Sequence, residues 1–347
     1  MNSTAPARIL VIGCGGIAGA WLPTLSTTPL AKVVGLCDLD LQRAEARNRE
    51  FACGAAVGTD PATMLAQLTP DIVVDLTIPE MHERIAVMAL QAGCHVLAEK
   101  PMAADLAGAK RILAAASAAG KTHAVMQNRR YLPQMLRTRD ALRSGAIGTL
   151  TELHADFYIG VHFGGFREQM RHVLLLDMAI HSVDQARFLA AGDPVAVNAL
   201  SWNPAGSWYS HGASALIAVE FDNGVRLTYR GSWCNAGAHT SWECAWRIIG
   251  TGGTIRWNGA DEVLIDAIEP YTQGFHATSK PIVAAPPAQA LEHQAHAGCI
   301  HEMLTAIRNG TQPQTHGADN IRSLAIIHAA IASADAGGAR VIVADLL

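Results

Sequence analysis

Three polar residues interrupt the apolar stretch HVLLLDMAIHSVD, residues 172–184. Asp177, His181 and Asp184 are spaced four and then three residues apart, which places them on one face of a helix. Two carboxylates and an imidazole on one face suit three roles: a metal site, a satisfied polar patch in the core, or part of a catalytic centre. Other residues of the chain are needed to choose between the three.

A lysine follows an apolar strand in the stretch LAEKPMAAD, residues 97–105. A charge beside a buried strand end costs desolvation, and Pro101 restricts Lys100 to an extended conformation that aims it out of the strand. A lysine at this position can bind a substrate hydroxyl and stabilise a developing alkoxide. The alternative is a surface lysine paired with Glu99.

A glycine turn follows the first strand, in VIGCGGIAG, where Gly13, Gly15 and Ala18 supply the pattern GxGxx[G/A]. The first glycine allows a tight turn, the second lets a pyrophosphate approach the backbone, and the small third residue lets helix and strand pack closely. The start of the following helix offers N–H groups to phosphates. The alternative is a glycine-rich turn in a doubly wound fold that binds no nucleotide.

The second strand ends in an acid, Asp38, 23 residues beyond Gly15. A carboxylate at this point can accept hydrogen bonds from the adenosine ribose and would repel a 2′-phosphate. We therefore expect NAD, with NADP as the alternative because Arg43 is close by.

The elements that must position these residues fall into two patterns. In the first 125 residues, apolar strands alternate with helices, which predicts a parallel sheet covered on both faces. The strands are expected at 8–13, 32–38, 71–78, 95–99 and 123–127, and the helices at 17–25, 40–52, 80–92 and 103–119.

The pattern changes after about residue 150. A strand (151–160) and a long helix that ends near residue 190 precede several strands with hairpin turns, which indicate an antiparallel sheet. These strands are expected at 195–202, 213–221, 225–233, 244–250, 253–257 and 262–268. The segment 269–290 reads as a long surface excursion, and helices at 292–308 and 319–335 close the chain.

Composition limits the classes of protein. A length of 347 residues favours two domains, and half of the residues are hydrophobic. The net charge is −4 and the basic residues form no long cluster, so no nucleic-acid partner is expected. The seven Cys form no CxxC pair and read as free thiols of a reducing compartment. With no signal peptide and no run near the roughly 18 apolar residues of a membrane span, we expect a soluble cytoplasmic protein with no membrane partner.

A second group of histidines lies in EHQAHAGCIHE, residues 292–302. His293, His296, Cys299 and His301 suggest zinc by residue type, but no two of the histidines stand four apart. The stretch opens a helix with an ordinary apolar stripe. We therefore predict no metal here, and none at Asp177 and His181, because a converging lysine would be a poor neighbour for a cation.

Five motifs occur in an order that resembles one family: GCGGIAG (13–19), PEMH (79–82), EKPM (99–102), NRRYLP (128–133) and LLDMAIHSVD (175–184). The combination is similar to the glucose–fructose oxidoreductase / inositol dehydrogenase family, Gfo/Idh/MocA. The stretch 317–343 resembles that family's closing helix and strand, so the resemblance covers essentially the whole chain.

The resemblance implies an α/β fold, with an N-terminal Rossmann domain that has a doubly wound parallel sheet (1–127). A C-terminal α+β domain with an open, mostly antiparallel sheet (128–347) would bind substrate and form a homodimer or homotetramer. The closing helix could pack back on the first domain. The implied reaction is NAD(P)-dependent hydride transfer to or from a secondary alcohol or ketone of a sugar, inositol or related polyol.

The family's lysine of EKP matches Lys100, and its aspartate and histidine of DxGxH match Asp177 and His181. A base with a pKa near neutrality suits the hydroxyl proton, so His181 is the best candidate. Asp177 can bind a neighbouring hydroxyl, and Lys100 can lower the pKa of the reacting one. The cofactor-binding residues expected along with them are Gly13, Gly15, Gly16, Ile17, Ala18, Asp38, Thr77, Pro79, His82, Glu99, Lys100 and Asn128.

The chain departs from the family just before its catalytic helix, where Arg171 and His172 replace residues that are often glycines. We expect these two residues to help recognise a carboxylate or extra hydroxyls, together with Arg129 and Tyr158; the alternative is an exposed pair at a helix start. Two other functions remain open: a glycosidase-like enzyme that uses NAD transiently, and a sensor that binds dinucleotide without catalysis.

Overall fold

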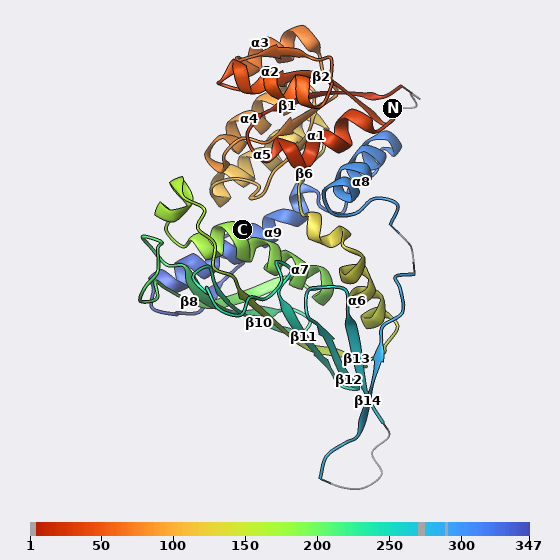
Figure 1. Cartoon of the computed structure of the whole chain (residues 1–347), viewed down its shortest axis with the longest axis vertical. Coiled ribbons are helices and arrows are strands. Elements are labelled where there is room, and N and C mark those ends of the chain that lie inside the picture. The colour runs from red at the N-terminus through yellow and green to blue at the C-terminus, as the bar shows by residue number, and fades with distance from the viewer. Residues whose placement is uncertain (1–4, 270–274, 289–290) are drawn as a thin grey trace. The chain divides into compact units, whose positions relative to one another are not determined.

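The computed structural model describes residues 5–269, 275–288 and 291–347. The chain divides into two compact units. The first comprises residues 1–128 and 292–321, and the second comprises 129–291 and 322–347. Each unit has its own sheet and is described separately (Figure 1). The division into functional domains at residues 1–127 and 128–347 remains a prediction.

The first unit is built on a six-stranded parallel sheet with the order β3-β2-β1-β4-β5-β6. The order reverses between β1 and β4, so right-handed crossovers place helices on both faces and bring the carboxyl ends of β1, β4 and β5 side by side. The strands are β1 (Ala7–Ile12), β2 (Ala31–Cys37), β3 (Ala56–Gly58), β4 (Ile72–Asp75), β5 (His95–Ala98) and β6 (His123–Val125).

The helices of this unit begin at caps that the sequence supplies. Asp40, Asp60 and Asp105 each accept a backbone N–H of the first turn of the helix that follows. The helices are α1 (Ala18–Thr27), α2 (Leu41–Glu50), α3 (Pro61–Leu68), α4 (Pro79–Gln91), α5 (Leu106–Ala119) and α8 (Ala295–Asn309). Helix α9 (Gly317–Asp335) begins in this unit and ends in the second.

The second unit contains a nine-stranded sheet with the order β14-β13-β12-β11-β7-β10-β9-β8-β15. Strands β7 and β10 pair in parallel and the other neighbours pair antiparallel. The strands are β7 (Leu150–Tyr158), β8 (Pro194–Trp202), β9 (Ser214–Phe221), β10 (Arg226–Ser232), β11 (Ala245–Gly250), β12 (Gly253–Trp257), β13 (Val263–Ile268), β14 (Ser279–Val283) and β15 (Val341–Ile342).

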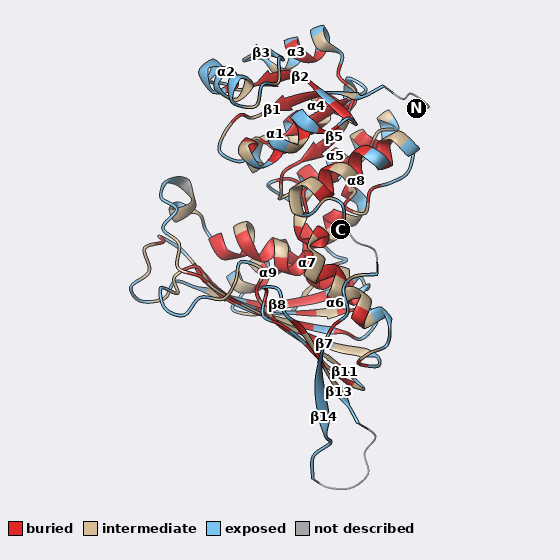
Figure 2. Cartoon of the chain, turned by 45° about the vertical axis from the view of Figure 1, so that its right-hand side comes forward, coloured by how far each residue is buried: buried red, intermediate tan, exposed pale blue. Residues whose placement is uncertain are grey.

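One face of this sheet is covered by helix, and Figure 2 shows buried residues on the helices beside it. The helices are η1 (Asn128–Tyr131, its first residue in the first unit), α6 (Pro133–Arg143), η2 (Gly165–Gln169), η3 (Leu174–Ala179) and α7 (Ile180–Ala190). The expected helix end near residue 190 and the expected fold class are both confirmed. Within the described ranges, no helix is long and apolar enough to cross a membrane.

Several elements differ from expectation. Helix α6 was not expected. Strand β3, with only three residues at a sheet edge, and α3, which begins at Pro61, were not expected either. Strand β14 lies in the expected surface excursion; it is fully exposed and contains Pro281, as edge strands tolerate. The short or exposed elements among these carry little hydrophobic periodicity, which explains why the sequence did not show them. Residues 270–274 and 289–290 of that excursion lie outside the described residues.

Candidate active site

The glycine turn after β1 has the geometry that a pyrophosphate requires. Gly13 has φ +99°, and a Cβ there would lie 2.6 Å from the carbonyl oxygen of Leu76, so only glycine fits. Beside Gly15 and Gly16 a Cβ would meet no atom within 4 Å. The N–H groups of Gly15, Gly16 and Ile17 donate to no described residue. An open cradle of N–H groups at a helix start therefore fits the phosphates of NAD.

Asp38 braces this turn. One carboxylate oxygen accepts the N–H of Cys14 at 2.7 Å, and the other accepts the N–H of Asp40 at 2.9 Å. Arg43 is directed at Asp40, with 3.4 Å between Nε and the carboxylate. Burial, followed by the Asp38 charge, raises the pKa of the Cys14 thiol to about 12. The half-buried Asp38 carboxylate keeps lone pairs for the ribose hydroxyls.

Apolar side chains stand exposed around the same sheet edge. Leu39 is 94% exposed and Ile78 is 55% exposed, and they directly follow Asp38 and Thr77. Ile17, at the helix start, is 39% exposed. Such exposed apolar groups beside a polar cradle suit a flat ring system such as adenine.

Glu99 joins the lysine loop to the cofactor helix. The indole N–H of Trp21, on α1, donates to one oxygen of Glu99 at 2.7 Å, and the N–H of Lys100 donates to the other at 3.1 Å. Trp21 is fully buried and Glu99 is 8% exposed. Both Glu99 oxygens therefore serve the positioning of this loop, and the peptide between Lys100 and Pro101 is cis.

His82 lies in the interior beneath the same edge. Its Nδ1 is 2.7 Å from the carbonyl oxygen of Pro101, and its Nε2 is 3.1 Å from that of Thr77. The histidine thus links the loop after β4 to the loop after β5. It is fully buried, and this position favours a role in holding Lys100 over a direct contact with cofactor.

A buried carboxylate accompanies this histidine. Asp75, at the end of β4, accepts the N–H and the hydroxyl of Thr77, at 3.0 and 2.6 Å. Burial raises its pKa, and the nearby His82 opposes that shift. Thr77 and Pro79, which were expected at the cofactor, begin the exposed turn into α4.

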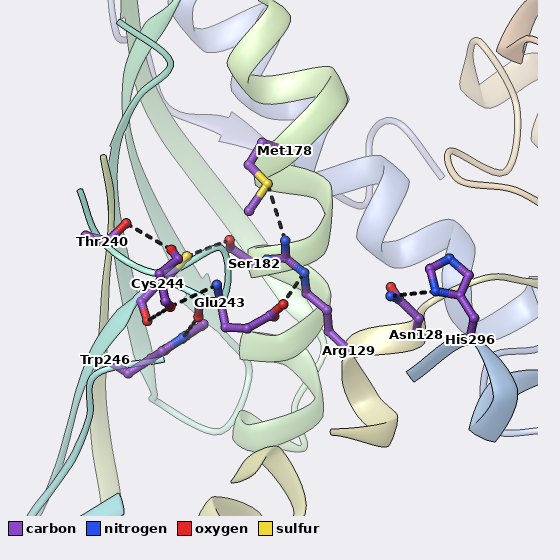
Figure 3. Close-up of polar contacts among 10 residues, drawn as sticks. Asn128, Arg129, Met178, Ser182, Thr240, Glu243, Cys244, Trp246 and His296 are labelled. Atoms are coloured by element: carbon purple, nitrogen blue, oxygen red, sulfur yellow. Dashed lines mark hydrogen bonds and ion pairs between the residues drawn. The ribbon is translucent and has the colours of Figure 1, made fainter. Parts of the chain in front are cut away.

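The histidines of residues 292–302 have separate surroundings. His296 packs edge-on against Trp21, with 6.5 Å between ring centres, and its Nδ1 lies 3.4 Å from the amide nitrogen of Asn128 (Figure 3). His293 and His301 stack on each other at 3.5 Å. In the part of the chain that the structure describes, no group of three potential ligands could hold a metal.

In the second unit, Asp177 lies in the π-helical turn η3 and His181 in the first turn of α7. The expectation of a regular α-helix is therefore corrected, since a π turn displaces the face that an α-helical spacing implies. Both side chains are half-exposed, whereas Met178 and Ile180 between them are buried. Arg167 lies 3.4 Å from the Asp177 carboxylate. This arginine was not anticipated, because it is ten residues away in a loop without a motif.

Arg129 supports the π-helical turn from inside (Figure 3). Its Nε forms an ion pair of 3.1 Å with Glu243, and its Nη2 donates to the sulfur of Met178 at 3.5 Å. Arg129 is 7% exposed, and burial raises the pKa of Glu243. Arg129 was expected at the substrate, but its burial favours a supporting role.

The other expected substrate residues also have partners. Arg171 and His172 both contact Asp335, at the end of α9, at 3.1 Å. His172 has φ +51°, the left-handed conformation that favours glycine, which fits the resemblance's implication that glycine is frequent at this point. Tyr158 ends β7, and its N–H donates to the hydroxyl of Thr240.

Asp184, the third member of the opening stripe, is a core residue. Arg130 binds its carboxylate with two hydrogen bonds, at 2.7 and 2.6 Å, and Ser323 donates to it at 2.8 Å. Asp184 is 1% exposed and cannot contact a ligand at the surface, in contrast to the partly exposed Asp177 and His181.

The fold and the glycine turn define a Rossmann-type oxidoreductase, and comparisons give its family. The model of an oxidoreductase family with an NAD-binding Rossmann fold, Gfo/Idh/MocA, matches residues 7–127, and the model of the GFO/IDH/MocA C-terminal domain matches residues 135–256. The chain belongs to the Gfo/Idh/MocA family, as the sequence motifs predicted. Its first domain is an NAD-binding domain.

Two curated relatives are dehydrogenases that act on a sugar or a glucoside. The chain is 29% identical over 332 residues to D-apiose dehydrogenase of Paraburkholderia graminis, covering 94% of this chain and 87% of the relative. It is 29% identical over 244 residues to D-glucoside 3-dehydrogenase of Escherichia coli, covering 64% and 69%. An Agrobacterium radiobacter oxidoreductase solved with NAD⁺, L-tartaric acid and magnesium has the same fold, with a TM-score of 0.87, 23% identity and coverage of 99% and 100%.

Proposed function

We propose that this chain is an NAD-dependent dehydrogenase of a sugar or polyol, with Lys100, Asp177 and His181 as its proton-handling residues. The observation that carries the proposal is the single sheet edge of the first unit. The glycine turn after β1 and Lys100 after β5 lie at the carboxyl ends of strands separated only by β4. A dinucleotide held by the turn therefore extends along the edge that bears the lysine.

The proposed chemistry divides into binding and proton transfer. When bound, NAD supplies the hydride acceptor. The Lys100 ammonium donates to the reacting hydroxyl and stabilises its developing negative charge. His181 removes the hydroxyl proton, and Asp177, held by Arg167, binds a neighbouring hydroxyl. Glu99 and His82 keep Lys100 in place.

The experiment is a panel of aldoses, inositols and open-chain polyols screened for reduction of NAD and of NADP. We expect reduction of NAD in preference to NADP by at least one class. Lys100→Met should lower kcat/KM by about 10²–10³-fold, and His181→Gln by about 10²–10⁴-fold. Exposed Lys110 and His211 provide the matched controls, Lys110→Met and His211→Gln.

Three outcomes would contradict the proposal. If the protein binds NAD but reduces neither cofactor with any substrate, the function is that of a sensor. If NAD stays bound and glycosides are cleaved without net NADH, the enzyme is glycosidase-like. If Lys100→Met behaves like Lys110→Met, the role of the lysine is wrong.

The proposal includes a homo-oligomer formed through the exposed face of the nine-stranded sheet. The register places Leu200 opposite Leu216, Leu216 opposite Arg230, and Arg230 opposite Asp156 in one row across the sheet. The two leucines are 46% and 38% exposed. Sedimentation of wild type and Leu216→Asp tests it, since a lower mass is expected for the variant and a monomeric wild type would contradict it. A reducing, cytoplasmic location is also proposed, supported by the seven free thiols.

A further inference from the structure

A group of aromatic side chains lies near the start of the helical segment that contains Asp177 and His181. Trp233 is 1% exposed and forms its centre. Its ring packs edge-on against Phe163 and Trp242, with 5.2 and 5.6 Å between ring centres. Phe163 and Trp242 are themselves 37% and 49% exposed. The buried Trp233 ring thus packs against two exposed rings. Exposed apolar groups that lie together in this way can mark a binding surface.

A second pair of rings includes His162, which directly precedes Phe163 in the chain. His162 stacks on Trp208 with 3.8 Å between ring centres and 18° between planes. The loop that carries Trp208 is fixed, because the indole N–H of Trp208 and the hydroxyl of Tyr209 both donate to the carbonyl of Val161, at 2.8 and 2.6 Å. The exposed His162 ring is therefore held in place by the chain's own loop.

The group of aromatic side chains is connected to Asp177 through one arginine. The Arg167 guanidinium lies over the Phe163 ring, 5.2 Å from its centre, and the same side chain pairs with Asp177 at 3.4 Å. Phe163 therefore belongs to the surroundings of Asp177.

This combination of groups matches the chemistry of a cyclic sugar. One face of a pyranose ring presents C–H groups, which suit the negative face of an aromatic ring, while its edge presents hydroxyls. The Arg167–Asp177 pair offers a donor and an acceptor for such hydroxyls. An open-chain polyol has no continuous C–H face and would gain little from the rings.

We propose that Phe163, Trp242 and the His162–Trp208 pair form a platform that binds the C–H face of a cyclic sugar, with the Arg167–Asp177 pair binding its hydroxyls. The proposal rests on the proposed function, because it makes Asp177 a substrate-binding residue. It adds a substrate class, pyranose-type rings in preference to open-chain polyols, and it gives a role to the loop around Trp208.

The test measures binding, so it does not depend on turnover. Four probes, the methyl pyranosides of glucose, galactose, mannose and xylose, are titrated into the enzyme–NADH complex and compared with xylitol. We expect at least one pyranoside to bind, with saturation transfer to its ring protons. Trp242→Ala and Phe163→Ala should weaken that binding about five- to tenfold, consistent with loss of one stacking contact. Trp202→Ala, which removes a 48% exposed indole from β8, should leave it unchanged.

The outcomes separate the two proposals. If no pyranoside binds, or if Trp242→Ala and Phe163→Ala behave like Trp202→Ala, the platform is wrong even where xylitol is oxidised. If Trp242→Ala changes only the sedimentation mass, the rings form a contact between copies of the chain and the platform is again wrong. If pyranosides bind through these rings but no substrate reduces NAD, the platform stands and the proposed dehydrogenase function fails.

Discussion

The two compact units position their polar groups by different means. In the first unit, many of the supports involve backbone groups: the glycine turn, and the carbonyls of Thr77 and Pro101 beside His82. In the second unit, the supports are side chains from distant segments, such as Glu243 for Arg129. A sequence motif can therefore predict local backbone geometry, but it cannot predict ion pairs between distant segments.

This contrast has an energetic side. A buried ion pair is stable only while both partners are present, because removal of one leaves a charge without compensation. A turn built from glycines and N–H groups carries no such dependence on a remote residue. The second unit should therefore be more sensitive to single substitutions far from Asp177 and His181.

Substitution of Arg129 is expected to have the largest effect on stability. Arg129→Met leaves the mostly buried Glu243 side chain, which is 23% exposed, without its partner and should lower the free energy of unfolding by about 3 kcal/mol, the low end for a buried pair. Urea unfolding monitored by tryptophan fluorescence measures this. Arg230→Met, in an exposed pair with Asp156, is the control and should cost less than about 1 kcal/mol. Equal effects of the two variants would mean that the Arg129–Glu243 pair contributes no more to stability than an exposed ion pair.

The next effect tests the backbone supports of the first unit. His82→Phe removes the ring nitrogens beside the carbonyls of Thr77 and Pro101, so at least one of these buried carbonyls loses its donor, which should cost about 2 kcal/mol of stability. Because Lys100 adjoins Pro101, we also expect kcat to fall about tenfold while the Kd for NAD stays within about twofold. Calorimetric titration and steady-state kinetics separate the two. A change in Kd with kcat intact would mean that His82 serves the cofactor directly.

A pH-dependent effect follows from a buried histidine of the first unit. Burial lowers the pKa of His123 to about 3, from 6.5, so its contribution to stability is present above pH 6.5 and is lost as the pH falls toward 3. Between pH 6.5 and 5 this loss amounts to about 2 kcal/mol. His123→Leu should remove that part of the slope in urea unfolding. Exposed His211→Gln should leave the slope unchanged, and an unchanged slope in His123→Leu would contradict the assignment.

The smallest effect concerns the choice of cofactor. Asp38→Asn removes the charge that opposes a 2′-phosphate, so the ratio of kcat/KM for NAD over NADP should fall about tenfold, or about 1.4 kcal/mol. Initial rates with both cofactors provide the measurement. Asp40→Asn, on an exposed neighbour, is the control. A ratio that is the same in wild type and Asp38→Asn would show that Asp38 serves only to brace the turn.

Most elements of the first unit could be predicted from the sequence, and the reason is physical. Buried parallel strands are continuous apolar runs, and the turn after β1 needs glycine at Gly13 whatever surrounds it. The same reasoning missed β3 and α3, which are too short to show a period. It expected His82 at the cofactor, which stays a prediction; the sequence position indicated a sheet edge but did not show that His82 is fully buried.

The second unit was less predictable. The strands were found from alternation, yet a spacing of four residues could not show that Asp177 lies in a π-helical turn. Arg167, in the short helix η2, and Trp208, in a loop, have partners that are brought close only by folding. Arg171 and His172 were expected at the substrate because they replace glycines of the family, and this stays a prediction. The sequence could not show that both contact Asp335, more than 160 residues away.

The burial of Cys14 has a consequence for how the enzyme tolerates oxidants and alkylating reagents. A thiol in the turn that cradles phosphate would, if reactive, make cofactor binding vulnerable to peroxide. With its pKa raised to about 12, only about one thiol in 10⁵ is ionised at neutral pH. The pKa of each of the other six thiols is raised as well, chiefly by burial. Iodoacetamide should therefore modify the folded protein slowly, and purification should need no reducing agent.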